Sequence, residues 1–273
     1  MSKRVHGSSL IECMLVASLS ACAVLAAISM LQSANAAFVQ QEQFALLQDN
    51  GRYAVSIIAR AVRQVAYVDH ALMDAAPDTT MAIQGQDNKG VNGSDELTLH
   101  FAGSGVVADG NVINCAGFAI ANALPDQGWS IFYVASNSQG EPELRCKYFG
   151  GNGWSSQALV SGVESFQVLY GVDTDADGIV NQYLNATSVT ALSHWNRVVA
   201  LRIALLLRSA RHAGSSLRPD HYALFGETYE AAGDPGTRIN LSSLPANSRL
   251  WPRQLVQSTL YLRNTLSAGS VLP

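Results

Sequence analysis

The sequence predicts an α+β fold, in which a long N-terminal α-helix packs on a mainly antiparallel β-sheet body. An apolar run reaches about Leu31, and the chain continues without Pro to Val68 with Val55, Ile58 and Val62 at helical spacing. After residue 94, segments that alternate apolar and polar residues are separated by Gly, Asn and Asp, as in antiparallel meanders. A charged fraction of 14% with 22 Gly in 273 residues is typical of a β-rich body joined to a membrane-soluble segment.

The first half of the predicted helix has the length of a membrane span. From Ser9 to Leu31 it would extend roughly 34 Å, enough to cross a bilayer. Lys3 and Arg4 precede it and favour a cytoplasmic N-terminus, with the rest of the chain outside. A secretory signal peptide is the alternative, but the run is too long and contains an acid, Glu12. A carboxylate near the start of such a segment costs free energy in a membrane, so its presence indicates a function.

Residues 7–12, Gly-Ser-Ser-Leu-Ile-Glu, resemble the class III signal of type IV prepilins. In that family a prepilin peptidase cuts after the Gly and methylates the new amino terminus. The resemblance implies cleavage between Gly7 and Ser8 and methylation of Ser8, which stands where the family usually has Phe. Glu12 becomes the fifth mature residue. Because an unpaired carboxylate and an unpaired ammonium are both costly in lipid, we expect Glu12 to pair with a neighbouring subunit's amino terminus.

The predicted organisation has four parts: a prepilin leader (1–7), a transmembrane or filament-core helix (8–31), its amphipathic continuation (32–68) and a periplasmic β-rich body (69–273). Polar residues 69–94 read as a loop region. Strands are expected over 97–101, 112–113, 118–120, 130–135, 143–149, 157–160, 163–172, 195–208 and 255–264.

Two internal regions resemble one particular group within the type IV prepilins. Residues 47–54, Leu-Gln-Asp-Asn-Gly-Arg-Tyr-Ala, closely resemble the stretch found here in PilW-type minor pilins, and so does the region 163–208. The resemblance implies a type IV pilin-like fold. Residues 195–208 are the most apolar stretch of the body and are expected to form a central buried strand. A second membrane span is disfavoured, because the run is short and contains Arg202.

The four cysteines divide by environment. Cys13 and Cys22 lie in the apolar run, where they are expected to behave as small hydrophobic residues. Cys115 and Cys146 lie in the body, and an exported body favours a disulfide between them over two free thiols.

An acidic turn follows the strand predicted at 163–172. Asp173, Asp175 and Asp177, with Gly178, copy the first half of an EF-hand loop. The twelfth position is Leu184 instead of a bidentate Glu, and no flanking helices are evident. Two interpretations stay open: a Ca²⁺ site, and an acid-rich surface turn without a cofactor.

The sequence contains no nucleophile elbow, no Walker A loop and no His-Glu-x-x-His motif, so an enzyme is not expected. Its net charge is −4 and its basic residues are scattered, which argues against nucleic acid as a partner.

The resemblance implies a minor subunit of the type IV pilus that initiates or caps assembly. The expected partners are other minor pilins, the major pilin, prepilin peptidase and, before assembly, inner-membrane lipid. The expected location is the inner membrane, with a periplasmic C-terminal body, and then the pilus. Alternatives are a tip-proximal pseudopilin of a type II secretion system, a Ca²⁺-dependent tip adhesin and a plain membrane-anchored protein.

Overall fold

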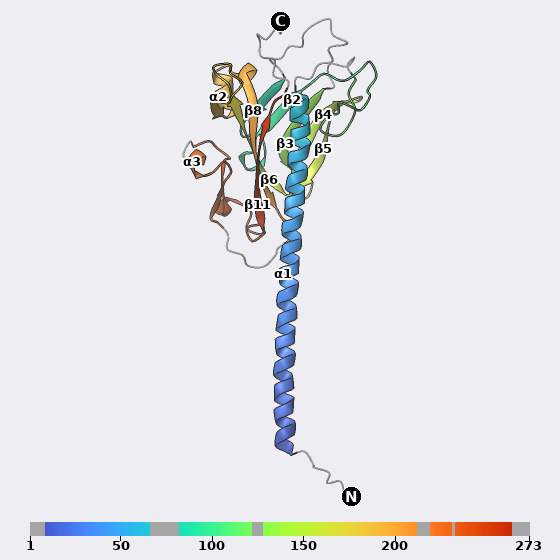
Figure 1. The fold of residues 1–273 in the computed structure, drawn as a ribbon, viewed down its shortest axis with the longest axis vertical. Helices are drawn as coiled ribbons and strands as arrows, with labels where there is room; N and C mark the ends of the chain where they lie inside the picture. The colour runs from blue at the N-terminus through green and yellow to red at the C-terminus, as the bar shows by residue number, and fades with distance from the viewer. Residues whose placement is uncertain (1–8, 66–81, 122–127, 212–218, 231–232, 264–273) are drawn as a thin grey trace.

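The computed structural model describes residues 9–65, 82–121, 128–211, 219–230 and 233–263. Its largest element is helix α1 (Leu10–Gln64), whose N-terminal half extends far from the body (Figure 1). The helix begins after Ser9, which forms a capping box with Glu12, and it ends where Val65 becomes extended. The predicted helix over 8–68 is therefore found over residues 10–64; Ser9 and Val65 are its caps, and residues 8 and 66–68 lie outside the described residues.

The second half of α1 buries one stripe against the body. Buried residues recur every three or four positions along this stripe, at Gln43, Leu47, Gly51, Ala54, Ile58 and Ala61, and the stripe widens near its end to include Ile57, Ala59 and Val62. A Cβ on Gly51 would lie 2.7 Å from Cγ2 of Val256, so glycine lets the helix and the neighbouring strand approach closely. The helix is thus fixed to the body only from about Gln43 onward.

The first sheet is a five-stranded antiparallel meander. Its strands are β1 (Ile83–Gln86), β2 (Glu96–His100), β3 (Trp129–Ser136), β4 (Pro142–Gly150) and β5 (Gly153–Ser161), in that spatial order. The short polar strand β1 lies in the region predicted as a loop, because its residues carry no apolar alternation. The strands expected at 112–113 and 118–120 are reduced to one bridge between Ile113 and Ala119.

The second sheet has the order β11-β8-β6-β7 and is also antiparallel. Its members are β6 (Val163–Val172), β7 (Gln182–Leu184), β8 (Val198–Arg208) and β11 (Arg253–Tyr261). Strand β8 is central and almost fully buried, as predicted, although the first three expected residues form a 3-10 turn, η5 (Trp195–Arg197). The start of β8 therefore depends on pairing with its neighbouring strands, not on the local sequence pattern.

Short elements complete the body. They are the hairpin partners β9 (His221–Ala223) and β10 (Arg238–Asn240), helices α2 (Ala186–Ala191) and α3 (Glu227–Glu230), and 3-10 turns η3 (Val91–Gly93) and η6 (Leu241–Ser243). None of them was predicted, since each has too few residues to show a periodic pattern.

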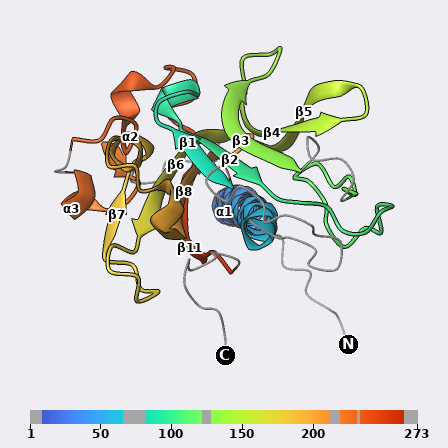
Figure 2. The ribbon, with the colours of Figure 1, turned by 90° about the horizontal axis from the view of Figure 1, so that it is seen from above.

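The two sheets meet at Gly162, between β5 and β6. Gly162 has φ +79°, and a Cβ there would lie 2.5 Å from the carbonyl oxygen of Arg208, so other residues are strained at this junction. Figure 2 shows α1 seated where the sheets meet. One apolar cluster joins all three, with Ile58 of α1, Leu144 of β4 and Leu201 of β8 among its members.

Candidate assembly site

The first half of α1 exposes an apolar surface that no other described part of the chain covers. It includes Leu10, Ile11, Met14, Leu15, Val16, Leu19, Val24, Leu25, Ile28, Met30 and Leu31. By length and composition α1 is able to cross a membrane, with a mean hydropathy of 2.3 over its most apolar window, none of which is buried. Such a surface requires lipid or neighbouring apolar helices.

Serine hydroxyl groups within this apolar half donate hydrogen bonds to backbone carbonyl groups of the same helix. Ser18, Ser20, Ser29 and Ser33 each donate to the carbonyl oxygen three residues earlier, at 2.8–2.9 Å. No hydroxyl hydrogen of these serines therefore needs a partner from outside, which suits a segment placed in hydrocarbon.

Glu12 stands at the start of this surface, in the first turn of α1. Its Oε2 accepts the backbone N–H of Ser9 at 2.9 Å, while Oγ of Ser9 accepts the N–H of Glu12 at 3.3 Å. A carboxylate accepts several hydrogen bonds, so the capping box leaves capacity for a further donor. The structure thus gives Glu12 a role within its own helix that the sequence argument did not foresee. Gly7 and Ser8 lie outside the described residues, and their cleavage and methylation stay predictions.

A buried ion cluster lies where α1 enters the body. Arg253 of β11 donates to both oxygens of Glu164, at 2.5 and 2.9 Å, and the Nε of Arg208 lies 3.6 Å from the same carboxylate. Arg208 also pairs with Glu141, and its guanidinium lies 4.3 Å from the centre of the Trp251 ring. Burial raises the pKa of Glu164, and the bonds from Arg253 oppose that shift.

Sequence reasoning missed this cluster, although one signal was available. Glu164 interrupts the apolar alternation at the start of β6, and the register with β8 shifts between Val163 and Ser165. The three charged residues come from three strands, so only the folded sheet brings them together.

The predicted disulfide is present. Cys115, in the loop after β2, is bonded to Cys146 of β4, and both are buried. Cys13 and Cys22 are free and exposed on the apolar half of α1. The disulfide therefore ties a long loop to the first sheet, and the two remaining thiols lie outside the body.

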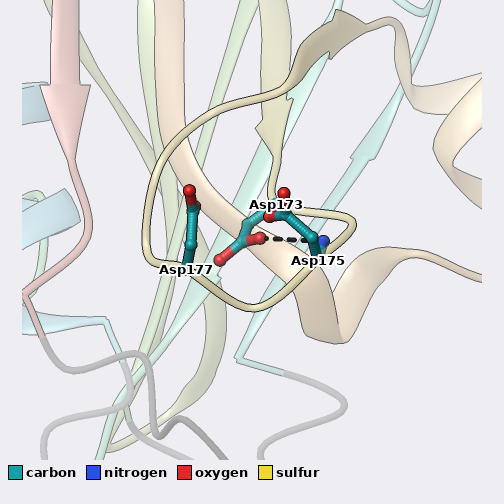
Figure 3. A group of neighbouring side chains, drawn as sticks. All are labelled: Asp173, Asp175 and Asp177. Atoms are coloured by element: carbon teal, nitrogen blue, oxygen red, sulfur yellow. Dashed lines mark hydrogen bonds between the residues drawn. The ribbon is translucent and has the colours of Figure 1, made fainter.

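The structure brings the three predicted acids together. Asp173, Asp175 and Asp177 offer carboxylate oxygens within 4.8 Å of one another in the turn after β6 (Figure 3). Asp173 accepts the backbone N–H groups of Ala176 and Gly178, both at 2.7 Å. Burial raises the pKa of Asp173, but these N–H bonds outweigh it and hold the pKa below its ordinary value.

Backbone amides of the turn thus compensate part of the negative charge of the three acids. This compensation is compatible with a Ca²⁺ site and with an acid-rich surface turn. The Ca²⁺ hypothesis stays a prediction, because the amides and a cation stabilise the same carboxylate form.

A long N-terminal helix with an exposed apolar half, packed on antiparallel sheets, is the architecture of a type IV pilin-like protein. A comparison with known protein families agrees with this pilin-like architecture. Residues 131–264, from β3 to the end of β11, match the family model described as PilW, type IV pilus-assembly protein W. The match covers just under half of the chain and, with the fold, supports a PilW-type minor pilin.

A solved type IV-like pilin from Thermus thermophilus is similar to this chain, with 14% sequence identity and a TM-score of 0.44. The alignment covers 80% of this chain and 98% of that pilin. No curated protein matches the sequence. Family and fold are those of structural pilins, not of known enzymes.

Proposed function

We propose that this minor pilin initiates or caps assembly of the type IV pilus. The observation that carries the proposal is the uncovered apolar half of α1 with Glu12 at its start. Before assembly this half lies in the inner membrane and the body lies in the periplasm. Prepilin peptidase then cuts after Gly7, and the apolar surface exchanges lipid for neighbouring helices.

Glu12 sets the register of that exchange. Its carboxylate pairs with the amino terminus of an adjacent subunit, since each charge removes the cost of leaving the other unpaired in a medium of low dielectric constant. The neighbours are the major pilin and other minor pilins. Contacts of this head-to-tail kind repeat without closing, so the assembly is an open helix.

The terminal position follows from the size of the body. Two sheets and the β9–β10 pair form a body beside one end of α1 (Figure 1), and such bulk suits one end of a filament better than a repeating shaft. A regular stoichiometry of the chain along sheared filaments would contradict a capping or initiating role.

The test separates docking from helix capping. Glu12→Ala removes both functions of the carboxylate, whereas Ser9→Ala breaks the capping box and keeps the acid. We expect Glu12→Ala to abolish co-purification with other pilins from membranes, and Ser9→Ala to retain it. Glu42→Ala, at an exposed position on the same helix, is the matched control. Equal loss in both Ser9 and Glu12 variants would assign Glu12 to capping alone.

Two further experiments test cleavage after Gly7 and the choice between pilus assembly and type II secretion. Co-expression with prepilin peptidase should shorten the chain by seven residues, and Gly7→Val should block the cut. An uncut chain would leave a plain membrane-anchored protein. A deletion strain should lose pili and retain protein secretion; the opposite result would assign the chain to a type II secretion system.

A further inference from the structure

A pocket of about 310 Å³ lies between the loop that follows β2 and the β4–β5 hairpin. In Figure 1 that loop (dark green) and the two strands lie at the upper right, at the end of the body away from the N-terminus. Among the described residues, its wall carries aromatic rings, amides and a hydroxyl, and no charged side chain. Its volume falls at the lower end of the range of about 300–1,000 Å³ for small-molecule sites.

Asn114 lines this pocket and carries a buried donor without a partner in the described part of the chain. Its Oδ1 accepts the backbone N–H groups of Ala116 and Phe118, at 3.0 and 3.1 Å, which fixes the orientation of the amide. The Nδ2 group on the other side has no hydrogen-bond partner among the described residues, although Asn114 is only 1% exposed. Buried donors without a partner are rare in folded proteins, so this one indicates a missing acceptor.

Aromatic rings form the rest of the wall and continue onto the outer face of the sheet. The rings of Phe118 and Tyr148 lie 5.3 Å apart, and Phe149 meets Trp154 edge-on at 5.4 Å. Phe149 lines the pocket, and Trp154 beyond it is 49% exposed. The faces of such rings are electronegative and attract the weakly positive C–H groups of a saturated ring.

The wall is also held rigidly. Cys115, next to Asn114, is bonded to Cys146 and donates its backbone N–H to the buried hydroxyl of Ser130 at 2.9 Å. Tyr148 follows two residues after the second cysteine. A preformed wall loses little conformational entropy when a ligand binds, which favours binding of a small molecule.

We propose that this pocket binds a neutral sugar unit of a glycan. A sugar offers hydroxyl oxygens as acceptors for Asn114 and C–H faces for the rings, and the side chains of Asn152 and Ser155 lie in the same wall. The described lining has no cation to pair with a phosphate or carboxylate, which favours a neutral ligand. Nδ2 is itself fully buried, so a sugar hydroxyl reaches it through a local shift of side chains while the disulfide keeps the backbone of the wall in place.

The test uses the full chain in a detergent without sugar headgroups. A panel of neutral hexoses, N-acetylhexosamines and their disaccharides is titrated by calorimetry and by tryptophan fluorescence. We expect saturable binding of at least one sugar. Asn114→Asp keeps acceptors for the two backbone N–H groups but replaces the donor, and should weaken binding about tenfold or more.

Phe118→Ala is a second variant. Because the Phe118 ring is exposed, this substitution does not place an acid in the folded interior, as Asn114→Asp does. It should weaken sugar binding as well. Ile179→Ala, in the acidic turn, is the exposed control and should bind as the unaltered chain does. Binding of no sugar, or equal binding by all variants, overturns the proposal. So does cross-linking of the pocket to a neighbouring pilin in place of sugar binding. Pilus assembly depends on Glu12 and should persist in Asn114→Asp, so the two proposals fail independently.

Discussion

At the scale of single residues, the most informative side chains are polar groups that the body buries. Asp95 joins the two sheets: its backbone N–H donates to the carbonyl of Phe166 at 2.8 Å, and its Oδ2 accepts the N–H of Val168 at 2.9 Å. Only 4% of the residue is exposed. A carboxyl in this position links β2 to β6 where no strand pairing does.

Asp95 predicts a pH dependence of stability. Burial raises its pKa from 3.8 to about 8, although the N–H groups of Val168 and Asn88 oppose the shift. The folded chain therefore holds the proton more tightly than the unfolded chain. This contribution to stability is full below about pH 4 and is lost as the pH rises to about 8.

The measurement compares melting temperatures at pH 5 and pH 8. We expect a fall toward pH 8 in the unaltered chain and a smaller fall in Asp95→Asn, which cannot ionise. Asp49→Asn, at an exposed position on α1, is the control and should keep the full dependence. An identical pH dependence in all three chains would contradict the assignment to Asp95.

At the scale of elements, the contact between α1 and β11 depends on one missing side chain. Glycine within a helix costs about 1 kcal/mol relative to alanine, so Gly51 is unfavourable locally. The close approach of Val256 explains why it is tolerated. Packing thus outweighs helix propensity at this position.

Gly51→Ala should therefore destabilise the body by about 1 kcal/mol or more, despite its better helix propensity, because the new methyl group overlaps Val256. Denaturant unfolding of the single variants and of Gly51→Ala with Val256→Ala completes a double-mutant cycle. We expect the second substitution to recover part of the loss. A stabilising Gly51→Ala would show that the helix moves away from β11 without cost.

The acidic turn is a second element with a direct test. A Ca²⁺ ion bound by Asp173, Asp175 and Asp177 would raise the melting temperature in millimolar CaCl₂, and chelator would reverse the rise. Asp175→Asn should abolish the response, since it removes one ligand charge from an exposed position. A melting temperature that ignores both CaCl₂ and chelator would assign the cluster to an acid-rich turn.

At the scale of the whole molecule, the ion cluster of Glu164, Arg208 and Arg253 ties β6, β8 and β11 together at one end of the second sheet. Arg253→Met should cost about 3–5 kcal/mol, because it leaves the buried carboxylate of Glu164 with a weaker partner. Adding Glu164→Gln should restore much of the loss. Unfolding by denaturant measures both; an additive second loss would contradict charge burial as the cause.

The sequence predicted the features that long periodic patterns determine. Helix α1, the central strand β8 and most of the first sheet were predicted because their apolar residues recur over many positions. Strand β1 and the β9–β10 hairpin were not, since three or four residues show no period. The motif around Glu12 predicts an assembly contact, which stays a prediction, whereas the capping bond of Ser9 and the wall around Asn114 depend on three-dimensional contacts.

If α1 crosses the membrane as proposed, its exposed stretch between Leu31 and Gln43 would set the height of the body above the bilayer. Nearly every side chain over residues 32–42 is exposed, and the helix rises about 18 Å from Leu31 to Gln43. That stand-off exceeds the reach of an arginine side chain. In the proposed membrane-bound state, the hollow beside Gln43, Arg208 and Trp251, next to the ion cluster, would therefore lie beyond the reach of lipid headgroups.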